Sequence, residues 1–183
     1  MKRVVERTFF STLLVLSVLA SFTIGAAHGV AGPRLNLTPS VPRGLYLYVP
    51  GRVERGQIVQ ACLPENLATY ARSHEILTRG PCPYDVEPIV KVLAAVAGDV
   101  VTVADDVRVN GHLWPTSAIR SFDSRSRRVE MRMPAGTLRL AANHVLLLGL
   151  HPSSWDGRYF GALSSSAVTG RWFPILTDKG VAL

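Results

Sequence analysis

The chain has 183 residues, of which 48% are hydrophobic and 18% are charged. This length suits one domain with a substantial core, and the apolar content excludes an intrinsically disordered protein. The formal net charge of +7 is carried mainly by arginine, because Lys2, Lys91 and Lys179 are the only lysines.

The N-terminus predicts a membrane anchor. Three basic residues within 1–7 precede residues 8–27, which carry no charge and are mostly apolar. A helix of that length rises about 30 Å, enough to cross the hydrocarbon core of a bilayer. The basic flank predicts a cytoplasmic N-terminus and an exported remainder. A cleavable signal peptide ending at the small residues 25–27 is the alternative, although the apolar run exceeds a usual signal core. We expect an anchor at 1–28 and one exported domain at 29–183.

The exported part predicts short strands joined by tight turns. A tether rich in glycine and proline is expected at 29–39, and a helix at 64–79, with proline in its first turn and Gly80 just after its end. Asn110–Gly111 is a strong hairpin signal within 107–114. Further strands are expected at 45–49, 57–63, 89–96, 100–103, 129–133, 137–140 and 145–150. The fold class is therefore mainly β, a folded sheet or barrel with a small helical insertion.

Two cysteines, Cys62 and Cys82, bracket the predicted helix. In an exported domain they would meet an oxidising compartment, so we expect a disulfide that holds the helix against the sheet. The alternative is a pair of unpaired small hydrophobic residues. Their spacing and the lack of neighbouring ligands do not support a zinc site.

A basic segment lies between residues 120 and 132. Its arginines are interrupted by Asp123 and Glu130, and they are Arg120, Arg125, Arg127, Arg128 and Arg132. Such a run is usually a solvated loop, and its possible partners are an anionic lipid surface, an acidic protein or nucleic acid. Because an exported protein seldom meets nucleic acid, we expect no nucleic-acid partner.

A serine near the predicted membrane edge is held in a restricted backbone. Pro39 and Pro42 flank Ser40, and Gly44 lets the chain turn into the next strand. This arrangement holds a hydroxyl in a fixed geometry.

A lysine lies inside the apolar strand predicted at 89–96. Both faces of this strand are apolar, so the Lys91 amine either reaches out at a sheet edge or is desolvated. Desolvation lowers the pKa of lysine, and a drop of about three units would make it a base near neutral pH. A neutral lysine can activate a serine hydroxyl, a known variant of the catalytic triad. Judged by local pattern alone, an edge lysine unrelated to any serine remains the alternative.

Three segments resemble motifs of the type I signal peptidases, in the order of that family. Residues 40–44, Ser-Val-Pro-Arg-Gly, resemble its nucleophile box, and the stretch from Lys91 to Gly98-Asp99 resembles its lysine box. Residues 154–161, Ser-Trp-Asp-Gly-Arg-Tyr-Phe-Gly, resemble its C-terminal box. The small size, the Gly-Leu-Tyr after the serine and the cysteine-bracketed insertion are most similar to the conjugal transfer branch of the family.

The resemblance implies roles for five residues. Ser40 would be the nucleophile and Lys91 the general base, while the Thr38 hydroxyl would help to hold the oxyanion. Ser154 would orient the lysine amine, with Ser153 as a rival because residues 149–153 depart from the family pattern. Asp156 would pair with Arg158 and has also been linked to activity in this branch.

The same resemblance implies a serine endopeptidase that needs no cofactor and no metal. Its substrate would be a pilin precursor, cleaved or cyclised for a conjugative pilus, and its partners the lipid bilayer and the conjugative transfer machinery. The catalytic domain would lie in the periplasm, on a single-pass anchor in the inner membrane. Two alternatives are a non-enzymatic envelope or pilus assembly protein, which leaves Lys91 unexplained, and a self-cleaving cytoplasmic repressor, which the export segment disfavours.

Overall fold

A computed structural model of the protein describes residues 30–123, 125–129 and 133–179. The anchor predicted at 1–28 lies outside the described residues. Within the described ranges, no helix combines the length and apolar character needed to cross a membrane. The elements are, in chain order, β1 (Gly32–Asn36), β2 (Gly44–Pro50), β3 (Ile58–Ala61), α2 (Glu65–Ser73), β4 (Ile89–Ala95), β5 (Val100–Val103), β6 (Val107–Val109), β7 (His112–Leu113), β8 (Gly136–Arg139), β9 (His144–Leu148), α3 (Gly157–Phe160), β10 (Leu163–Ser164), a 3₁₀ turn (Ser165–Ala167) and β11 (Val168–Thr177).

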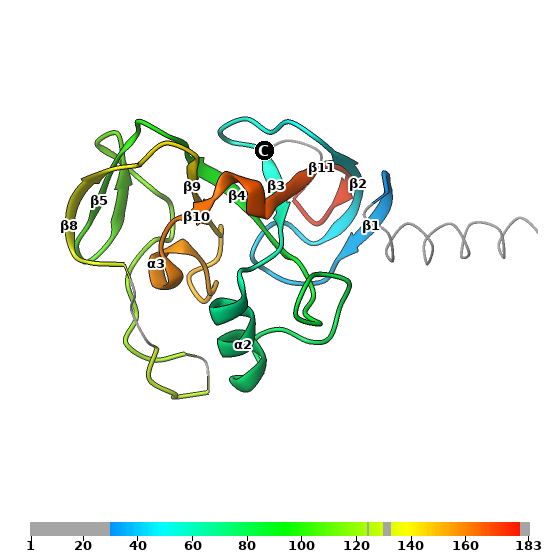
Figure 1. The fold of residues 1–183 in the computed structure, drawn as a ribbon, viewed down its shortest axis with the longest axis horizontal. Helices are drawn as coiled ribbons and strands as arrows, with labels where there is room; N and C mark the ends of the chain where they lie inside the picture. Colours follow the sequence, from blue (N-terminus) through cyan, green and yellow to red (C-terminus); the bar gives the residue numbers. More distant parts are fainter. Residues whose placement is uncertain (1–29, 124, 130–132, 180–183) are drawn as a thin grey trace, which may run out of the picture.

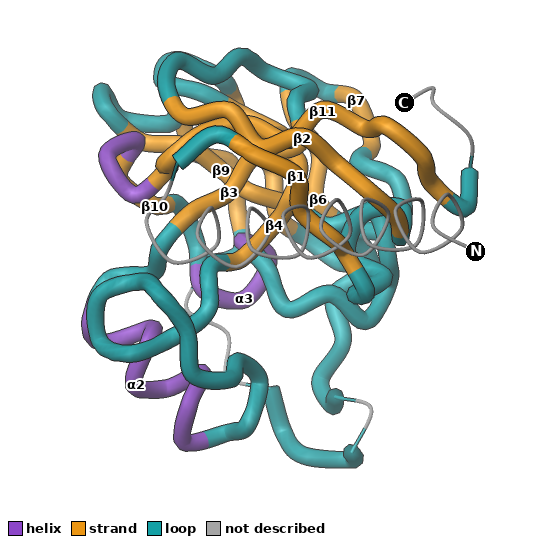
Figure 2. Tube along the Cα trace, turned by 90° about the vertical axis from the view of Figure 1, so that its right-hand side faces the viewer, coloured by secondary structure: helices purple, strands orange, loops and turns teal. Residues whose placement is uncertain are grey.

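The strands form two antiparallel sheets, as the mainly β prediction required. The larger sheet has the order β1-β2-β11-β3-β4-β9-β10 (Figure 1). The smaller sheet has the order β7-β6-β5-β8. The long strand β11 returns from the C-terminal part and lies between β2 and β3. Figure 2 shows the strands gathered on one side, with α2 and long loops on the other.

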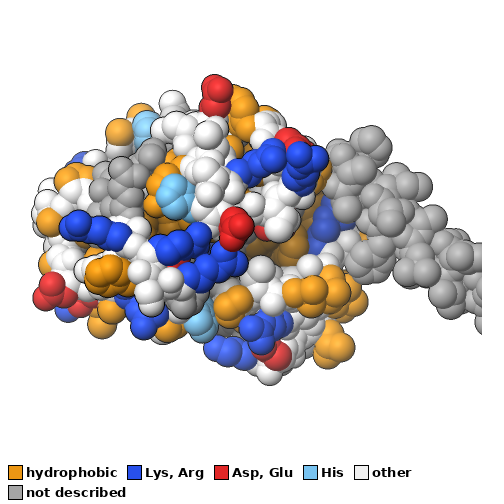
Figure 3. Space-filling model, turned by 90° about the horizontal axis from the view of Figure 1, so that it is seen from below, with side chains coloured by type: hydrophobic (Ala, Val, Ile, Leu, Met, Phe, Trp, Pro, Cys, Tyr) orange, Lys and Arg blue, Asp and Glu red, His pale blue; other side chains and the backbone are white. Residues whose placement is uncertain are grey.

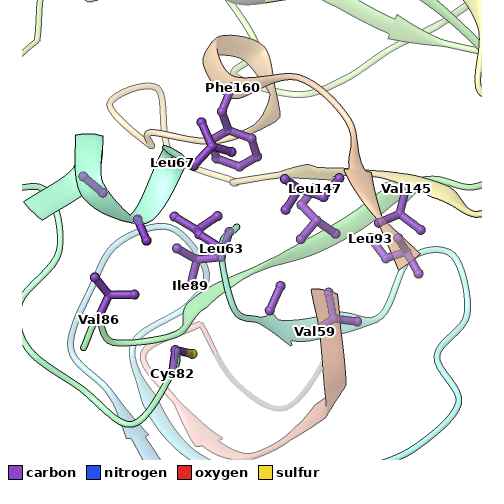
Figure 4. Packing of buried hydrophobic residues seen from close by; sticks show 14 residues of the cluster. Val59, Leu63, Leu67, Cys82, Val86, Ile89, Leu93, Val145, Leu147 and Phe160 are labelled. Carbon is purple, nitrogen blue, oxygen red and sulfur yellow. The ribbon is translucent and has the colours of Figure 1, made fainter. Parts of the chain in front are cut away.

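Three apolar clusters fill the interior. One joins α2 and α3 to β3, β4 and β9, and its members Leu63, Leu67, Ile89 and Phe160 are labelled in Figure 4. A second lies under the smaller sheet, and the third includes Tyr46, Tyr48 and Trp172 from β2 and β11. Strand β4 contributes to all three clusters, so its residues are buried on both faces, as its apolar sequence indicated.

Local signals placed several elements correctly. The bounds of strands β2, β3, β4, β5, β8 and β9 lie within two residues of the predicted ones. The predicted hairpin is formed by β6 and β7, and both Asn110 (φ 51°) and Gly111 (φ 82°) have the positive φ values of a type I′ turn. The predicted disulfide is also present between Cys62 and Cys82, with the Cα atoms 5.5 Å apart.

The helix prediction was wrong at its C-terminal end. Helix α2 ends at Ser73, six residues before the predicted end. Glu75 takes a left-handed φ of 52°, its N–H donates to the Arg72 carbonyl, and the Ile76 N–H donates to the Ala71 carbonyl. These two bonds are the Schellman arrangement, in which glycine is usual at the left-handed position. Because a glutamate occupies that position, the local sequence does not reveal the end.

Other predictions need correction at the chain ends and in the basic segment. The tether expected at 29–39 contains strand β1, which pairs with β2 along its whole length. Strand β11 was not predicted, since Gly170 and Pro174 interrupt its pattern. Of the strand expected at 129–133, residues 130–132 lie outside the described residues, and neither Val129 nor Met133 is in a strand.

Candidate active site

Ser40 and Lys91 meet in the structure. The Lys91 Nζ atom donates a hydrogen bond to Ser40 Oγ at 2.7 Å, although the two residues lie 51 positions apart. Both are buried, with exposed fractions of 8% for Ser40 and 6% for Lys91. A hydroxyl and an amine at this distance can exchange a proton directly.

The loop that carries Ser40 is fastened by Asn36, a residue that sequence reasoning did not single out. The Asn36 Nδ2 donates to the carbonyls of Thr38, Val41 and Pro42 at 2.9, 3.1 and 2.9 Å. Its Oδ1 accepts from the Thr38 backbone N–H at 3.1 Å. Asparagine at the end of a strand commonly stabilises a turn in this way, so its position at the end of β1 was an available signal.

Two further bonds connect this loop to its neighbours. The Leu150 N–H donates to the Ser40 carbonyl at 2.7 Å, and the Tyr46 hydroxyl donates to the Pro42 carbonyl at 2.6 Å. The loop is therefore tied both to β2 and to the segment that follows β9. Such fixing reduces the motion of the Ser40 hydroxyl.

Burial changes the acid–base behaviour of Lys91. Its side chain points into the protein from the middle of β4, opposite Val59 of β3. Desolvation lowers the pKa of Lys91 to about 8; the Asp156 carboxylate opposes the shift, and the Arg158 guanidinium adds to it. The sequence left two positions open for this amine, at a sheet edge in solvent or desolvated in the interior. The structure shows the desolvated position. A pKa near 8 leaves a useful fraction of neutral amine at moderately alkaline pH.

Ser154, and not its rival Ser153, lies at the Ser40–Lys91 pair. The Ser154 Oγ is 3.2 Å from Ser40 Oγ and is buried. The exposed Ser153 hydroxyl accepts a hydrogen bond from Arg120. The expected contact between Ser154 and the lysine amine is replaced by this bond to Ser40. Ser154 therefore contacts the serine hydroxyl directly.

Asp156 and Arg158 form a fully buried ion pair, as expected. Asp156 Oδ1 accepts from Arg158 Nε at 2.8 Å, and Asp156 Oδ2 accepts from Arg158 Nη2 at 2.9 Å. Asp156 Oδ2 also accepts from the Gly149 N–H, and Arg158 donates to the Ser154 carbonyl. The pair thus fastens both chain segments that surround Ser154.

Thr38 lies at the rim of the site. It is exposed, and its hydroxyl donates to Asn36 Oδ1 at 2.8 Å. To reach a substrate oxygen, the hydroxyl has to leave this bond.

The Ser40–Lys91 pair opens into a groove of about 910 Å³. Its lining includes residues 34–39, residues 87–91 and both cysteines of the disulfide. The Leu93 N–H donates to the Gln57 carbonyl of the segment before β3. Because hydrogen-bonded residues alternate along an antiparallel strand, the backbone of Lys91 also bonds to β3. The N–H and C=O of Val90 therefore point to the opposite side of β4. The pairing of β9 with β4 begins only at Val92, which leaves the Val90 backbone facing the groove. Such an edge can accept an extended peptide as an added strand.

A metal centre is not formed by the described residues, since they contain no group of three or more His, Cys, Asp or Glu side chains placed to hold an ion.

Comparison with known proteins defines the class. A model of the signal peptidase family, peptidase S26, matches residues 1–176, so the chain belongs to this family. Its relatives include two plasmid transfer proteins TraF from Escherichia coli. One is 34% identical over 86% of this chain and 90% of its own length, and the other is 33% identical over 97% and 99%. A probable conjugal transfer protein TraF from Sinorhizobium fredii is 35% identical over 90% of this chain and 87% of its own length.

The crystal structure of a signal peptidase I from Enterococcus faecalis also matches. It covers 67% of this chain and 98% of that protein, with 20% sequence identity and a TM-score of 0.37.

Proposed function

We propose that the protein is a serine endopeptidase of the signal peptidase type, with Ser40 as nucleophile and Lys91 as general base. The observation that carries this proposal is the 2.7 Å hydrogen bond between Lys91 Nζ and Ser40 Oγ in a buried site. Membership in the signal peptidase family supports the same class of reaction.

The proposed reaction begins when the neutral Lys91 amine takes the proton of the Ser40 hydroxyl. Ser40 Oγ attacks the substrate carbonyl, and the resulting ammonium then gives its proton to the leaving amine. This leaves the new N-terminus as a neutral amine and the other part of the substrate as an ester on Ser40. A water molecule, or an amine of the substrate itself, then attacks the ester. Water gives a linear product, and a substrate amine gives a cyclic one.

Two groups would stabilise the oxyanion during attack. One is the Ser40 backbone N–H and the other is the Thr38 hydroxyl, once it has turned away from Asn36. Ser154 would hold the Ser40 hydroxyl toward Lys91. The Asp156–Arg158 ion pair would keep Ser154 in place, and its aspartate partly offsets the lowering of the Lys91 pKa by desolvation.

We further propose that the substrate is a pilin precursor in a conjugative transfer system. The relatives are named as plasmid or conjugal transfer proteins, and they match along most of both chains. The groove and the open Val90 edge are suited to an extended peptide segment. The predicted anchor at 1–28 would hold the site at the periplasmic face of the inner membrane, next to the transfer machinery.

The test is cleavage of a pilin precursor co-expressed with the full chain in membranes. We expect wild type to release product, and Ser40→Ala and Lys91→Ala each to lower the rate by about 10³-fold or more. Ser166→Ala, at an exposed serine that does not line the groove, serves as the matched control. Product mass separates the two outcomes, because a cyclic product weighs one water less than the linear one. Equal processing by all four proteins would overturn the proposal and favour a non-enzymatic assembly role.

A further inference from the structure

A second pocket, of about 220 Å³, lies beside the catalytic groove. It is formed between the C-terminal end of α2 and the loop 119–129, which runs at the lower left of Figure 1. Its charged lining residues are Arg120, Arg125, Arg127 and Arg128, with Glu75 and Asp123. Figure 3 views the molecule from this side and shows Lys and Arg side chains gathered near the middle of the face.

Two of the four arginines are already paired. Arg125 forms an ion pair with Glu75, and Arg127 Nε lies 2.8 Å from Asp123 Oδ2. Arg120 donates only to the neutral Ser153 hydroxyl, at 3.0 Å. In the described part of the chain, neither Arg120 nor Arg128 has a carboxylate partner. Among the described residues, the pocket therefore presents two guanidinium groups that are not in an ion pair.

The pocket adjoins the groove and shares lining residues with it. Ile76, Ser153, Ser154 and Trp155 line both. Ser154 Oγ is 3.2 Å from the Ser40 hydroxyl, so the pocket begins one residue from the reacting atoms. A peptide bound along the groove can therefore place a side chain or a chain end in it.

One wall of the pocket is a stack of aromatic rings. Tyr70 stacks on His74 with ring centroids 4.0 Å apart and on Trp155 at 6.0 Å. Trp155 in turn packs edge-on against Phe160 at 5.0 Å, which connects the wall to the core. Arg120 and Arg128 are themselves exposed and line the same pocket as this aromatic wall, so an anion can reach them from solvent or from the groove.

We propose that this pocket is a substrate subsite that binds a carboxylate of the peptide through Arg120 and Arg128. Guanidinium groups match the fork of a carboxylate, and such charge-assisted bonds are among the stronger polar contacts in proteins. The carboxylate comes either from an acidic side chain near the scissile bond or from the end of the substrate chain. This inference rests on the proposed peptidase function and assigns that site a specificity.

The position of the pocket favours a peptide over a lipid headgroup. Strand β1, the described element nearest in sequence to the predicted anchor, lies on the right in Figure 1, at the opposite side from the loop 119–129. The pocket shares its wall with the groove and not with β1. The location of the two arginines beside the groove therefore fits a carboxylate of a bound peptide.

The first experiment compares cleavage of the pilin precursor by wild type, Arg120→Gln/Arg128→Gln and the control Arg108→Gln. Arg108 is a half-exposed arginine of β6, with Asp106 3.5 Å away, and it lines neither the groove nor the second pocket. We expect the double variant to raise KM about tenfold with kcat within about threefold, and the control to match wild type. The increase in KM should shrink as salt rises, because salt screens exposed charges. An unchanged KM in the double variant would overturn the inference.

A second set of substrates identifies the source of the carboxylate. In one, each Asp or Glu near the cleavage site is changed to its amide; in the other, the C-terminus is extended by a neutral segment. With wild type, kcat/KM for the substrate that lacks the bound carboxylate should be about tenfold lower. With Arg120→Gln/Arg128→Gln, the same change to the substrate should cause no further loss. If neither change affects wild type, no carboxylate is bound and the inference fails.

Binding without turnover separates this inference from the proposed function. Full-length Ser40→Ala in detergent is titrated with fluorescent peptides that differ only in Glu against Gln, and with vesicles of phosphatidylglycerol. Tighter binding of the Glu peptide that is lost in the arginine double variant supports the subsite, even if wild type cleaves nothing. Equal binding of the two peptides overturns it, as does an effect of the arginines on vesicles alone.

Discussion

Gly149 lies so close to Ser154 that a Cβ atom at position 149 would fall 2.2 Å from Ser154 Oγ and 2.5 Å from its Cβ. The backbone of Gly149 is thereby part of the wall that sets the Ser154 side chain against Ser40. Trp114 holds this backbone from the other side, since its Nε1 donates to the Gly149 carbonyl at 3.2 Å. The glycine is needed here because two chain segments approach closely.

Gly149→Ala should therefore impair catalysis by displacing Ser154. We expect kcat to fall about tenfold to a hundredfold, since small misplacements in an active site have effects of this size. Ser154→Ala should show a loss of similar size, while Ser153→Ala should change kcat much less. Gly32→Ala is the matched control, because its added Cβ would have only an ordinary contact of 3.5 Å. Full activity of folded Gly149→Ala would contradict the role given to Ser154.

The rate should depend on the protonation of Lys91. Because burial lowers its pKa to about 8, the neutral form that we propose as the base becomes scarce below that pH. We expect kcat/KM to rise about tenfold per pH unit up to about pH 8 and then to level off. Lys91→Arg should be inactive at every pH, since arginine stays protonated. A flat profile for wild type between about pH 6 and 9 would argue against a titrating lysine base.

The same depressed pKa makes a prediction about stability. Below pH 8 the buried lysine is charged, and the drop from 10.5 to about 8 corresponds to a cost of about 3 kcal/mol. Between pH 8 and 10.5 the unfolded chain binds more protons than the folded one, so wild-type stability rises with pH. Lys91→Met should thus exceed wild type in the free energy of unfolding below pH 8, and this advantage should shrink toward pH 10.5.

Urea denaturation at several pH values measures this difference. Lys179→Met, at an exposed position, is the control and should show no comparable gain. A Lys91→Met protein that is less stable than wild type at pH 6 would show that the hydrogen bond to Ser40 outweighs the cost of burying the charge.

Removal of Arg158 should destabilise the protein strongly. Asp156 has no exposed surface, so Arg158→Met leaves a buried carboxylate without its partner. The expected loss in the free energy of unfolding is about 3–5 kcal/mol. Arg55→Met is a matched control, because Arg55 is half exposed where it pairs with Asp99. This substitution should lower the free energy of unfolding by about 1 kcal/mol or less. Equal losses in the two variants would contradict the structural role of the buried pair.

The disulfide should contribute to stability by restraining the unfolded chain. It links residues 20 positions apart, and its removal in Cys62→Ser/Cys82→Ser should lower the free energy of unfolding by about 2–4 kcal/mol. Reducing agent should bring wild type to the same value and leave the double variant unchanged. If reduction leaves wild-type denaturation unaltered, the bridge has no such effect.

The sequence predicts those elements that depend on the conformational preferences of a few neighbouring residues. Asn110 and Gly111 adopt left-handed backbone conformations readily, so the hairpin between β6 and β7 could be placed from two residues. Strand β11 could not be predicted in this way. Its Gly170 is required because a Cβ there would lie 2.5 Å from the Val49 carbonyl of β2, a contact visible only after the strands pair.

The sequence by itself determined the restrained serine, the apolar strand around the lysine, and the cysteines that bracket a helix, because each depends on neighbours within a few residues. Only the tertiary structure decided that Ser40, Lys91 and Ser154 meet, across separations of 51 and 114 residues. It also decided that the lysine is desolvated and not at an edge, and that Ser154, not Ser153, lies against Ser40. The physical reason is that desolvation and hydrogen-bond geometry arise from groups remote in the chain, which folding alone brings together.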